Sequence, residues 1–108
     1  MNRGDIVVVA TKGTYTGKPR PALIVQDNLF NDVHASITLC PITSEAIDAP
    51  LFRVSLPAGP RTGLQATSQV MVDKIVSVPR GAIGKRIGRC TPDELEAIDD
   101  ALRRWLGL

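Results

Sequence analysis

Aromatic side chains are scarce in this sequence, which has one tryptophan, one tyrosine and two phenylalanines in 108 residues. The core must therefore be built mainly from valine, isoleucine and leucine. No apolar run approaches the roughly 20 residues that a membrane-spanning helix needs. Residues 1–5 lead directly into a strand pattern rather than into the apolar stretch of a signal peptide, so we expect a cytoplasmic protein.

Groups that bind metals or undergo redox chemistry are also few. Cys40 and Cys90 stand far apart without C-x-x-C spacing, and His34, the single histidine, lies in a polar segment. This spacing favours two buried free thiols over a disulfide or a metal site, and a solvated His34. The glycine patterns of nucleotide-binding loops and hydrolase elbows are missing as well. We therefore expect neither a metal nor another cofactor.

The composition that remains is that of an ordinary globular domain, with 44% hydrophobic and 22% charged residues. The length suits one domain spanning residues 1–108 and is too short for two. The net charge of +2 is small, but the basic residues gather in two segments, which suits a polyanionic ligand. These residues are Lys12, Lys18 and Arg20, followed by Arg80, Lys85, Arg86 and Arg89.

Short β-branched or alternating segments, bounded by turn residues, run through most of the chain. We expect strands at residues 5–10, 20–26, 36–40, 52–56, 63–67, 69–78 and 86–90. Pro41 is expected to end the third of these strands. Six or seven short strands followed by one helix predict a mainly β fold, namely a small antiparallel barrel or strongly bent sheet with the helix packed against it.

The hydrophobic period changes at Thr91, which marks the expected start of a helix. Thr91 can cap the helix, Pro92 suits its first position, and Glu94 completes a capping box. Apolar residues then recur at helical spacing, which predicts a C-terminal amphipathic helix that packs on the sheet. They are Leu95, Ile98, Leu102, Trp105 and Leu106.

Two strand ends carry side chains suited to phosphate chemistry. Arg20 stands between Pro19 and Pro21, so its backbone is stiff and its planar guanidinium can bind a phosphate through two hydrogen bonds. An arginine paired with a carboxylate at the rim of the sheet is an equally good interpretation of this position. Thr43 and Ser44 offer hydroxyl donors, although a Pro-x-Thr-Ser corner also stabilises turns.

Five short motifs occur in order along nearly the whole chain: RGDIV at 3–7, GT at 13–14, RPALIV at 20–25, PITS at 41–44 and DKIVSV at 73–78. The last begins with Asp73, a charged residue in an apolar segment that needs a partner or a task. Each motif alone is common. Their order and spacing, together with the final helix, resemble the MazF/PemK family of toxin–antitoxin ribonucleases.

This resemblance implies an SH3-like barrel, a homodimer whose facing surfaces form an RNA groove, and a cognate antitoxin that is small, acidic and partly disordered. It also implies metal-independent cleavage of single-stranded RNA at short sequences. The attacking group would be the 2′-hydroxyl of the substrate itself, and the products a 2′,3′-cyclic phosphate and a 5′-hydroxyl.

Three residues match family residues that act in catalysis. Arg20 matches the arginine that serves as acid, base or phosphorane stabiliser, and Thr43 matches the threonine that contacts the scissile phosphate. Asp73 matches a strand aspartate that assists catalysis or substrate binding in some members. The RNA-binding residues that we expect are Thr14, Tyr15, Lys18, Ser44, Gln69 and Lys74.

Two positions depart from the family pattern. Family loops often carry an acidic residue, and in some members a histidine, before the R-P pair, but here the loop reads GTYT at 13–16, so that Tyr15 offers a ring for base stacking instead. Met71 stands where some PemK-like members place an arginine. Two other functions remain open: a gyrase-inhibiting toxin of the related CcdB type, and a non-catalytic nucleic-acid-binding module on the same scaffold.

Overall fold

The computed structural model describes residues 1–10 and 18–108 and has seven strands followed by one long helix. The strands are β1 (Asp5–Val9), β2 (Arg20–Ile24), β3 (Ser36–Thr43), β4 (Arg53–Leu56), β5 (Ser68–Met71), β6 (Val76–Pro79) and β7 (Ile83–Arg89). The helical elements are α1 (Asn28–Asn31), η1 (Val72–Lys74), η2 (Arg80–Ala82) and α2 (Pro92–Leu106). The predicted mainly β fold with a C-terminal helix is therefore confirmed.

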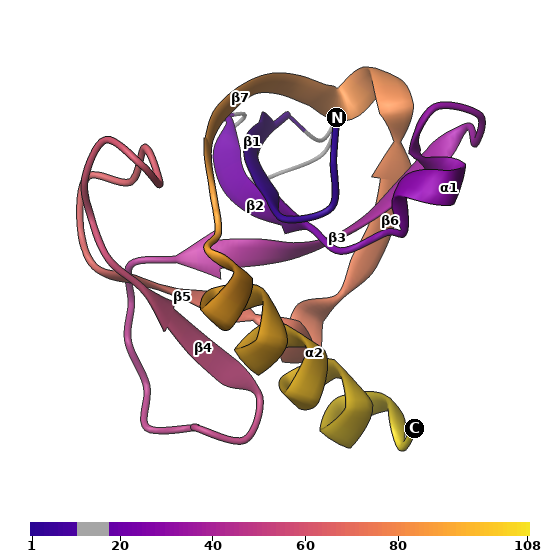
Figure 1. Ribbon diagram of the computed structural model, residues 1–108. Coiled ribbons are helices and arrows are strands. Elements are labelled where there is room, and N and C mark those ends of the chain that lie inside the picture. Colours follow the sequence, from indigo (N-terminus) through magenta and orange to yellow (C-terminus); the bar gives the residue numbers. More distant parts are fainter. Residues whose placement is uncertain (11–17) are drawn as a thin grey trace.

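One long strand, β3, organises the sheet. The strand order is β4-β5-β3-β2-β1-β7, all pairs are antiparallel, and β6 joins the sheet at β3. One edge of β3 pairs with β6 through residues 36–39 and with β5 through Ile42 and Thr43, while the other edge pairs with β2. Because two strands share one edge of β3, the sheet bends there, and β7 arches over β1 (Figure 1).

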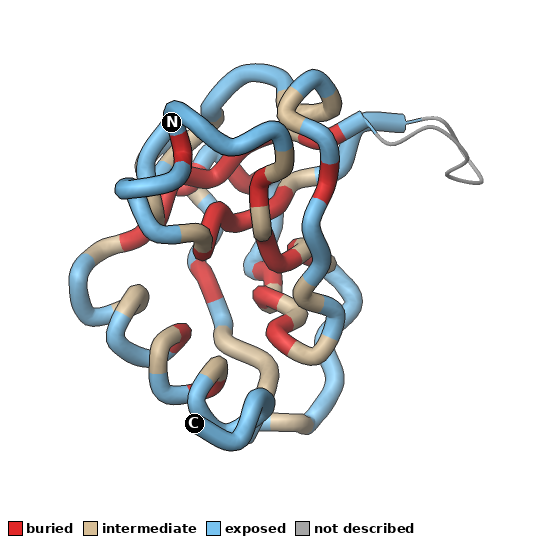
Figure 2. The backbone as a smooth tube through the Cα atoms, turned by 90° about the vertical axis from the view of Figure 1, so that its right-hand side faces the viewer, coloured by how far each residue is buried: buried red, intermediate tan, exposed pale blue. Residues whose placement is uncertain are grey.

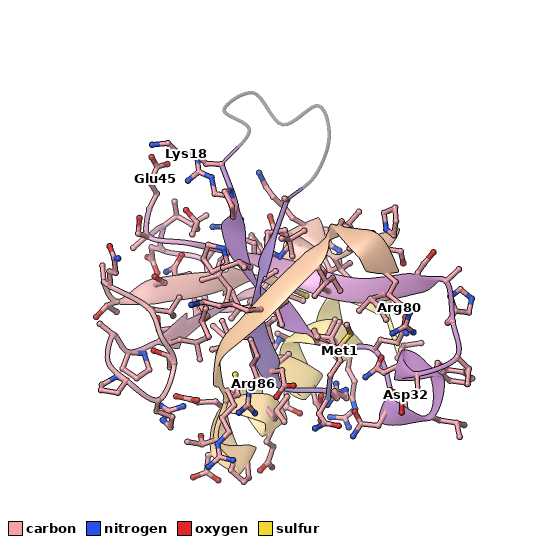
Figure 3. The ribbon with its side chains drawn as sticks, turned by 90° about the horizontal axis from the view of Figure 1, so that it is seen from above. Met1, Lys18, Asp32, Glu45, Arg80 and Arg86 are labelled. Carbon is pink, nitrogen blue, oxygen red and sulfur yellow. The ribbon has the colours of Figure 1, made fainter. Side chains whose placement is uncertain are left out.

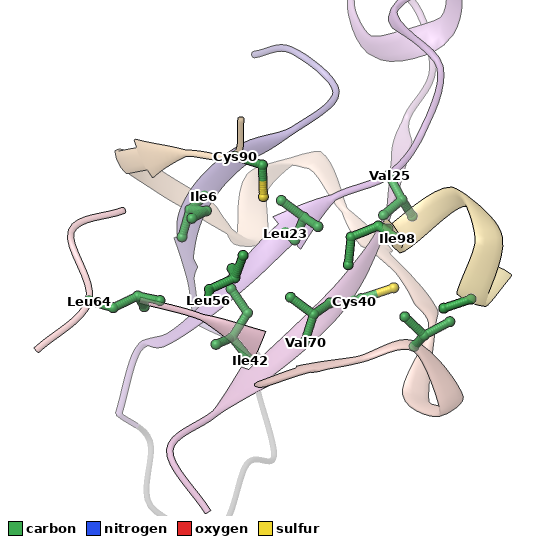
Figure 4. Close-up of a cluster of buried hydrophobic side chains, with 12 residues drawn as sticks. Ile6, Leu23, Val25, Cys40, Ile42, Leu56, Leu64, Val70, Cys90 and Ile98 are labelled. Atoms are coloured by element: carbon green, nitrogen blue, oxygen red, sulfur yellow. The ribbon is translucent and has the colours of Figure 1, made fainter. Parts of the chain in front are cut away.

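In β3, buried residues mostly alternate with half-buried ones, and they enter one core in its first half and another in its second. In β1 and β2, by contrast, adjacent residues are buried and enter different cores (Figure 2). This burial explains why the sequences of β1 and β2 are continuously apolar rather than alternating. The inner core consists of Val7, Val9, Ala22, Ile24, Ile37, Leu39 and Val78. The helix-side core, drawn in Figure 4, consists of Ile6, Leu23, Val25, Cys40, Ile42, Leu56, Leu64, Val70, Val72, Cys90, Ile98 and Ala101.

The prediction that Pro41 ends its strand is wrong, because β3 continues to Thr43. Pro41 pairs with Ala22 of β2. On the other edge it stands between Leu39, the last residue paired with β6, and Ile42, the first paired with β5. Proline is tolerated at such an interruption of a ladder, where its missing N–H leaves no acceptor unpaired. The strand therefore carries Thr43 to the far end of the sheet.

Two further strand predictions are wrong. Residues 63–67 form turns, with an isolated bridge between Gly59 and Leu64. The segment 69–78 is interrupted by η1, so β5 and β6 are separate strands that pair with different parts of β3. The interruption places Asp73 on a 3-10 turn rather than inside a strand.

The predicted start of the C-terminal helix is confirmed at α2. Thr91 Oγ1 accepts a hydrogen bond from the Glu94 N–H at 3.1 Å, and Glu94 Oε1 accepts one from the Thr91 N–H at 2.9 Å. Arg61 adds two hydrogen bonds to the same carboxylate, at 2.8 and 2.9 Å. These contacts tie the first turn of α2 to the segment before β5.

The apolar face of α2 is covered only in its first three turns. The predicted packing of the helix on the sheet is confirmed by Ile98, which is fully buried, whereas Trp105 and Leu106 are 48% and 51% exposed. The helix has 15 residues and packs on two short elements, β4 with four residues and η1 with three. These elements do not cover its last turn. Trp105 instead contacts Phe52, with ring centroids 5.5 Å apart. Across the described ranges, no helix is long and apolar enough to cross a membrane.

The cysteines are buried and free, as the sequence predicts. Burial raises the pKa of the Cys40 thiol to about 12, and it raises that of Cys90 to about 12 as well. Both thiols are therefore protonated at neutral pH. His34 is exposed in the loop before β3, which is also as predicted.

We expect Glu94→Gln to lower the free energy of unfolding at neutral pH. Burial alone would raise the pKa of Glu94, but the hydrogen bonds from Arg61 and Thr91 outweigh it and lower that pKa. The stabilisation is therefore present at pH values above the pKa of Glu94 in the unfolded chain. It is lost as the pH falls through the pKa of Glu94 in the folded protein. Urea unfolding of the wild type and of Glu94→Gln, at neutral pH and at about pH 3, measures how the difference in unfolding free energy depends on pH.

Glu96→Gln is the matched control, because Glu96 is exposed on the same helix. A stability difference between the wild type and Glu94→Gln that stays constant into the acid range would contradict the assignment.

Candidate functional site

A cleft of about 850 Å³ lies at the end of the sheet where β2 begins and β3 ends. Val8 of β1, Pro21 of β2 and Ile87 of β7 line it, together with residues 63–66. Within the described residues, Arg20 and Glu45 are the only charged side chains of its lining. The cleft therefore combines an apolar surface with one positive and one negative group.

The segment that contributes residues 63–66 to the lining is held firmly. Gly63 has a φ of 72° and lies so close to the Ile87 carbonyl that a Cβ would collide with it. Thr62 Oγ1 donates a hydrogen bond to the Pro57 carbonyl at 2.7 Å, and the Arg89 N–H donates one to the Arg61 carbonyl at 3.0 Å. These contacts hold residues 61–63 against β7.

Arg20 is the first residue of β2 and lies at the mouth of the cleft. Its backbone pairs with Val9 of β1, and both flanking prolines line the cleft with it. The side chain is exposed, and it forms no ion pair with any carboxylate in the ranges that the structure describes. Of the two interpretations of the sequence, an unpaired arginine that faces a ligand site fits better than a rim ion pair.

Thr43 is the last residue of β3 and lines the same cleft as Arg20. Its Oγ1 accepts a hydrogen bond from the Glu45 N–H at 3.1 Å. Because the oxygen is engaged as an acceptor, the hydroxyl proton remains available to donate to a ligand oxygen. The hydroxyl thus stabilises the turn and also presents a donor to the cleft. Ser44, the next residue, lines the cleft as well.

Gln69 does not line the cleft but holds the loop that follows Thr43. Its backbone pairs with Thr43, and its side-chain amide contacts the backbone of Ile47 twice. Gln69 Oε1 accepts a hydrogen bond from the Ile47 N–H at 3.1 Å, and Nε2 donates one to the Ile47 carbonyl at 2.9 Å. The loop containing Ser44 and Glu45 is therefore fixed at both of its ends.

Asp73 lies outside the cleft lining and has a structural partner. Its Oδ1 accepts a hydrogen bond from Arg53 Nε at 3.0 Å, and the two side chains are only 16% and 9% exposed. This pair joins η1 to β4. Lys74, on the same turn, is exposed and also lies outside the lining, whereas Met71 lies within it.

The remaining predicted RNA-binding residues come from the loop before β2. Lys18 is exposed next to Pro19, and Figure 3 shows it at the same end of the molecule as Glu45. Thr14 and Tyr15 lie outside the described residues. The structure therefore brings Arg20, Thr43 and Ser44 together, and it leaves Gln69, Asp73 and Lys74 outside the cleft lining.

Sequence reasoning missed Glu45. The available signal was an acidic residue two positions after Thr43. A glutamate in a loop is ordinarily solvated, so its position in the sequence does not indicate that it lines a cleft. In the described part of the chain, no group of three histidine, cysteine, aspartate or glutamate side chains is placed to hold a metal ion.

We expect Asp73→Ala to lower the free energy of unfolding by about 3–5 kcal/mol, because it leaves the Arg53 charge buried without a partner. Replacing both residues with leucine removes the charge as well as its partner, so the double variant should lose less stability than the sum of the single changes. Urea unfolding of the single and double variants measures these differences. Additive losses would show that the pair is not coupled.

Comparison with known proteins places the chain in a family. A family model described as "PemK-like, MazF-like toxin of type II toxin-antitoxin system" matches residues 2–106. The chain is 45% identical over 108 residues to a "Probable endoribonuclease MazF" of Mycolicibacterium smegmatis, covering 100% of this chain and 98% of that protein.

Solved structures agree with this match. A MazE–MazF structure from Deinococcus radiodurans superposes with a TM-score of 0.84 at 27% identity, covering 100% of this chain and 97% of the other. A structure described as "Endoribonuclease in complex with its cognate antitoxin from Mycobacterial species" gives a TM-score of 0.81 at 28% identity, covering 100% and 96%. The chain therefore belongs to the family of PemK-like, MazF-like toxins of type II toxin–antitoxin systems.

Proposed function

We propose that this chain is a metal-independent endoribonuclease toxin that cleaves single-stranded RNA in the cleft between Arg20 and Thr43. The observation that carries the proposal is their convergence: Arg20 begins β2, Thr43 ends the neighbouring β3, and both line one cleft with side chains that can donate hydrogen bonds. The names of the similar proteins from M. smegmatis and from mycobacterial species, both described as endoribonucleases, support the same activity.

The reaction requires stabilisation of a phosphorane that carries more negative charge than the bound phosphate. A guanidinium remains protonated throughout the physiological range and can donate two parallel hydrogen bonds, so Arg20 serves as the stabiliser of this charge. The hydroxyl of Thr43 donates to another phosphate oxygen. The 2′-oxygen of the substrate attacks phosphorus, the bond to the 5′-oxygen breaks, and a 2′,3′-cyclic phosphate remains.

Further residues are proposed to bind the RNA strand around the scissile phosphate. Ser44 directly follows Thr43, Lys18 lies two positions before Arg20, and both are exposed. Lys74 is exposed and can contact a phosphate beyond the cleft, while Gln69 acts by holding the loop after Thr43. Asp73 contributes through its pair with Arg53, and Thr14 and Tyr15 stay predictions as groups for base contact and stacking.

The chain is also proposed to work as one toxin domain over residues 1–108, as a homodimer in the cytoplasm, where messenger RNA is available. Its partner is a small acidic antitoxin. Support comes from the antitoxin complexes of similar proteins. An acidic segment that folds on binding would be attracted by the exposed basic residues of the toxin and would compete with RNA for them.

We expect Arg20→Ala to lower the rate of RNA cleavage by about 10²- to 10³-fold, because it removes the charge that stabilises the phosphorane. Thr43→Val removes one donor and should cost about 10²-fold. The measurement uses purified protein and an RNA pool in EDTA, with sequencing of the ends for 2′,3′-cyclic phosphate. Arg103→Ala, an exposed arginine of α2, serves as control.

Intact RNA with the wild-type chain, or equal cleavage by Arg20→Ala, would refute the nuclease proposal. Trapping of gyrase on DNA instead would point to the CcdB-type function. Salt-sensitive RNA binding that survives Arg20→Ala without any cleavage would point to a binding module.

We expect co-expression with an acidic reading frame adjacent to the gene to restore growth and to protect RNA from cleavage. The two products should co-purify at low salt and separate partly at high salt, because screening weakens contacts between exposed charges. Growth that remains arrested, together with no co-purification, would contradict the antitoxin proposal.

A further inference from the structure

We propose that Glu45 is the general base of the cleavage reaction, an inference that rests on the endoribonuclease function proposed above. The 2′-hydroxyl must lose its proton as it attacks phosphorus, so a group that accepts a proton at neutral pH has to lie beside it. A protonated guanidinium cannot take this proton, and a threonine hydroxyl is a poor base. A carboxylate can accept it.

Glu45 is the one carboxylate in the cleft lining within the described ranges. The other charged member of that lining is Arg20, which is assigned to the phosphate. In the sequence, no aspartate or glutamate occurs between Asp5 and Asp27, so the loop that leads into β2 contains no carboxylate. The cleft therefore has one residue of the required chemistry.

The carboxylate of Glu45 is also uncommitted. It forms no ion pair in the part of the chain that the structure describes, and its side chain is exposed. Buried or half-buried acids elsewhere behave differently: Asp73 pairs with Arg53, and Glu94 pairs with Arg61. Those carboxylates stabilise the fold, whereas Glu45 has no described contact that would explain it structurally.

The backbone around Glu45 is nevertheless fixed. The N–H of Glu45 donates to Thr43 Oγ1 at 3.1 Å. This hydrogen bond links the proposed base directly to the hydroxyl that is proposed to bind the phosphate. Two residues later, the side chain of Gln69 holds both backbone polar groups of Ile47. A base on a loop fixed in this way loses little conformational entropy when the substrate binds.

The proton transfer balances without a co-reactant. The 2′-oxygen gives its proton to a carboxylate oxygen of Glu45 while the bond from O2′ to phosphorus forms and the bond from phosphorus to O5′ breaks. The departing 5′-oxygen takes a proton from water, and protonated Glu45 returns its own proton to the hydroxide that is left. Arg20 stabilises the charge on the phosphorane throughout the step.

The test measures single-turnover cleavage of an oligonucleotide that contains the cleavage site mapped for the wild-type chain. Glu45→Gln should lower the rate by about 10²- to 10⁴-fold, and Glu45→Asp, which keeps a carboxylate, should retain more activity. The same oligonucleotide with a 2′-deoxy sugar at the cleavage site should bind Glu45→Gln as tightly as the wild type or more tightly, because this variant lacks the negative charge of the carboxylate. Glu96→Gln, an exposed acid of α2, should cleave at the wild-type rate.

A second substrate separates the base from the acid. With sulfur in place of the bridging 5′-oxygen, the leaving group needs no proton, so loss of a general base should still slow the reaction. Four results with Glu45→Gln would each overturn this inference while leaving the proposed function intact. They are cleavage at the wild-type rate, a defect confined to binding, a change in the sequence cleaved without a loss of rate, and a rate defect that disappears with the sulfur substrate. A wild-type chain that leaves RNA intact would overturn the proposed function and this inference together.

Discussion

The sharing of β3 among three partner strands is the constraint on which the rest of the structure depends. Its first half pairs with β2 and β6 and so encloses the inner core, while its second half pairs with β2 and β5 and so turns the sheet towards α2. The strand then ends in Thr43 at the cleft. A change that shortened β3 at this end would therefore remove the pairing with β5 and uncover the helix-side core. It would also displace Thr43, which is proposed to bind the phosphate.

The parts of this fold that follow from the sequence are those with local causes. The start of α2 depends on Thr91 and Glu94, which are three residues apart, so the capping box could be recognised without any tertiary information. The presence of a charged residue in the apolar segment 69–78 has a distant cause. Asp73 is tolerated in that apolar segment because Arg53, on another strand, neutralises it, and no local pattern reveals this partner.

The candidate site was predictable to the extent that its residues lie at strand ends within recognisable motifs. Arg20 and Thr43 belong to such motifs, and their convergence follows from the adjacent strands β2 and β3. Glu45 belongs to no motif. Its place in the cleft depends on the turn after β3 and on the contact between Gln69 and Ile47, both of which require the folded sheet.

Three arginines outside the cleft are used differently from Arg20. Outside it, Arg3, Arg53 and Arg61 are each matched by a carboxylate, so these side chains contribute to stability or to local order. Arg20 and Glu45 line one cleft but form no ion pair with each other in the described structure. An ion pair would neutralise both groups and leave the arginine less able to hold a phosphate. Two unpaired opposite charges, one at the start of β2 and one on the fixed loop after β3, instead provide separate positions for the phosphate and for a proton acceptor, as cleavage by an internal hydroxyl requires.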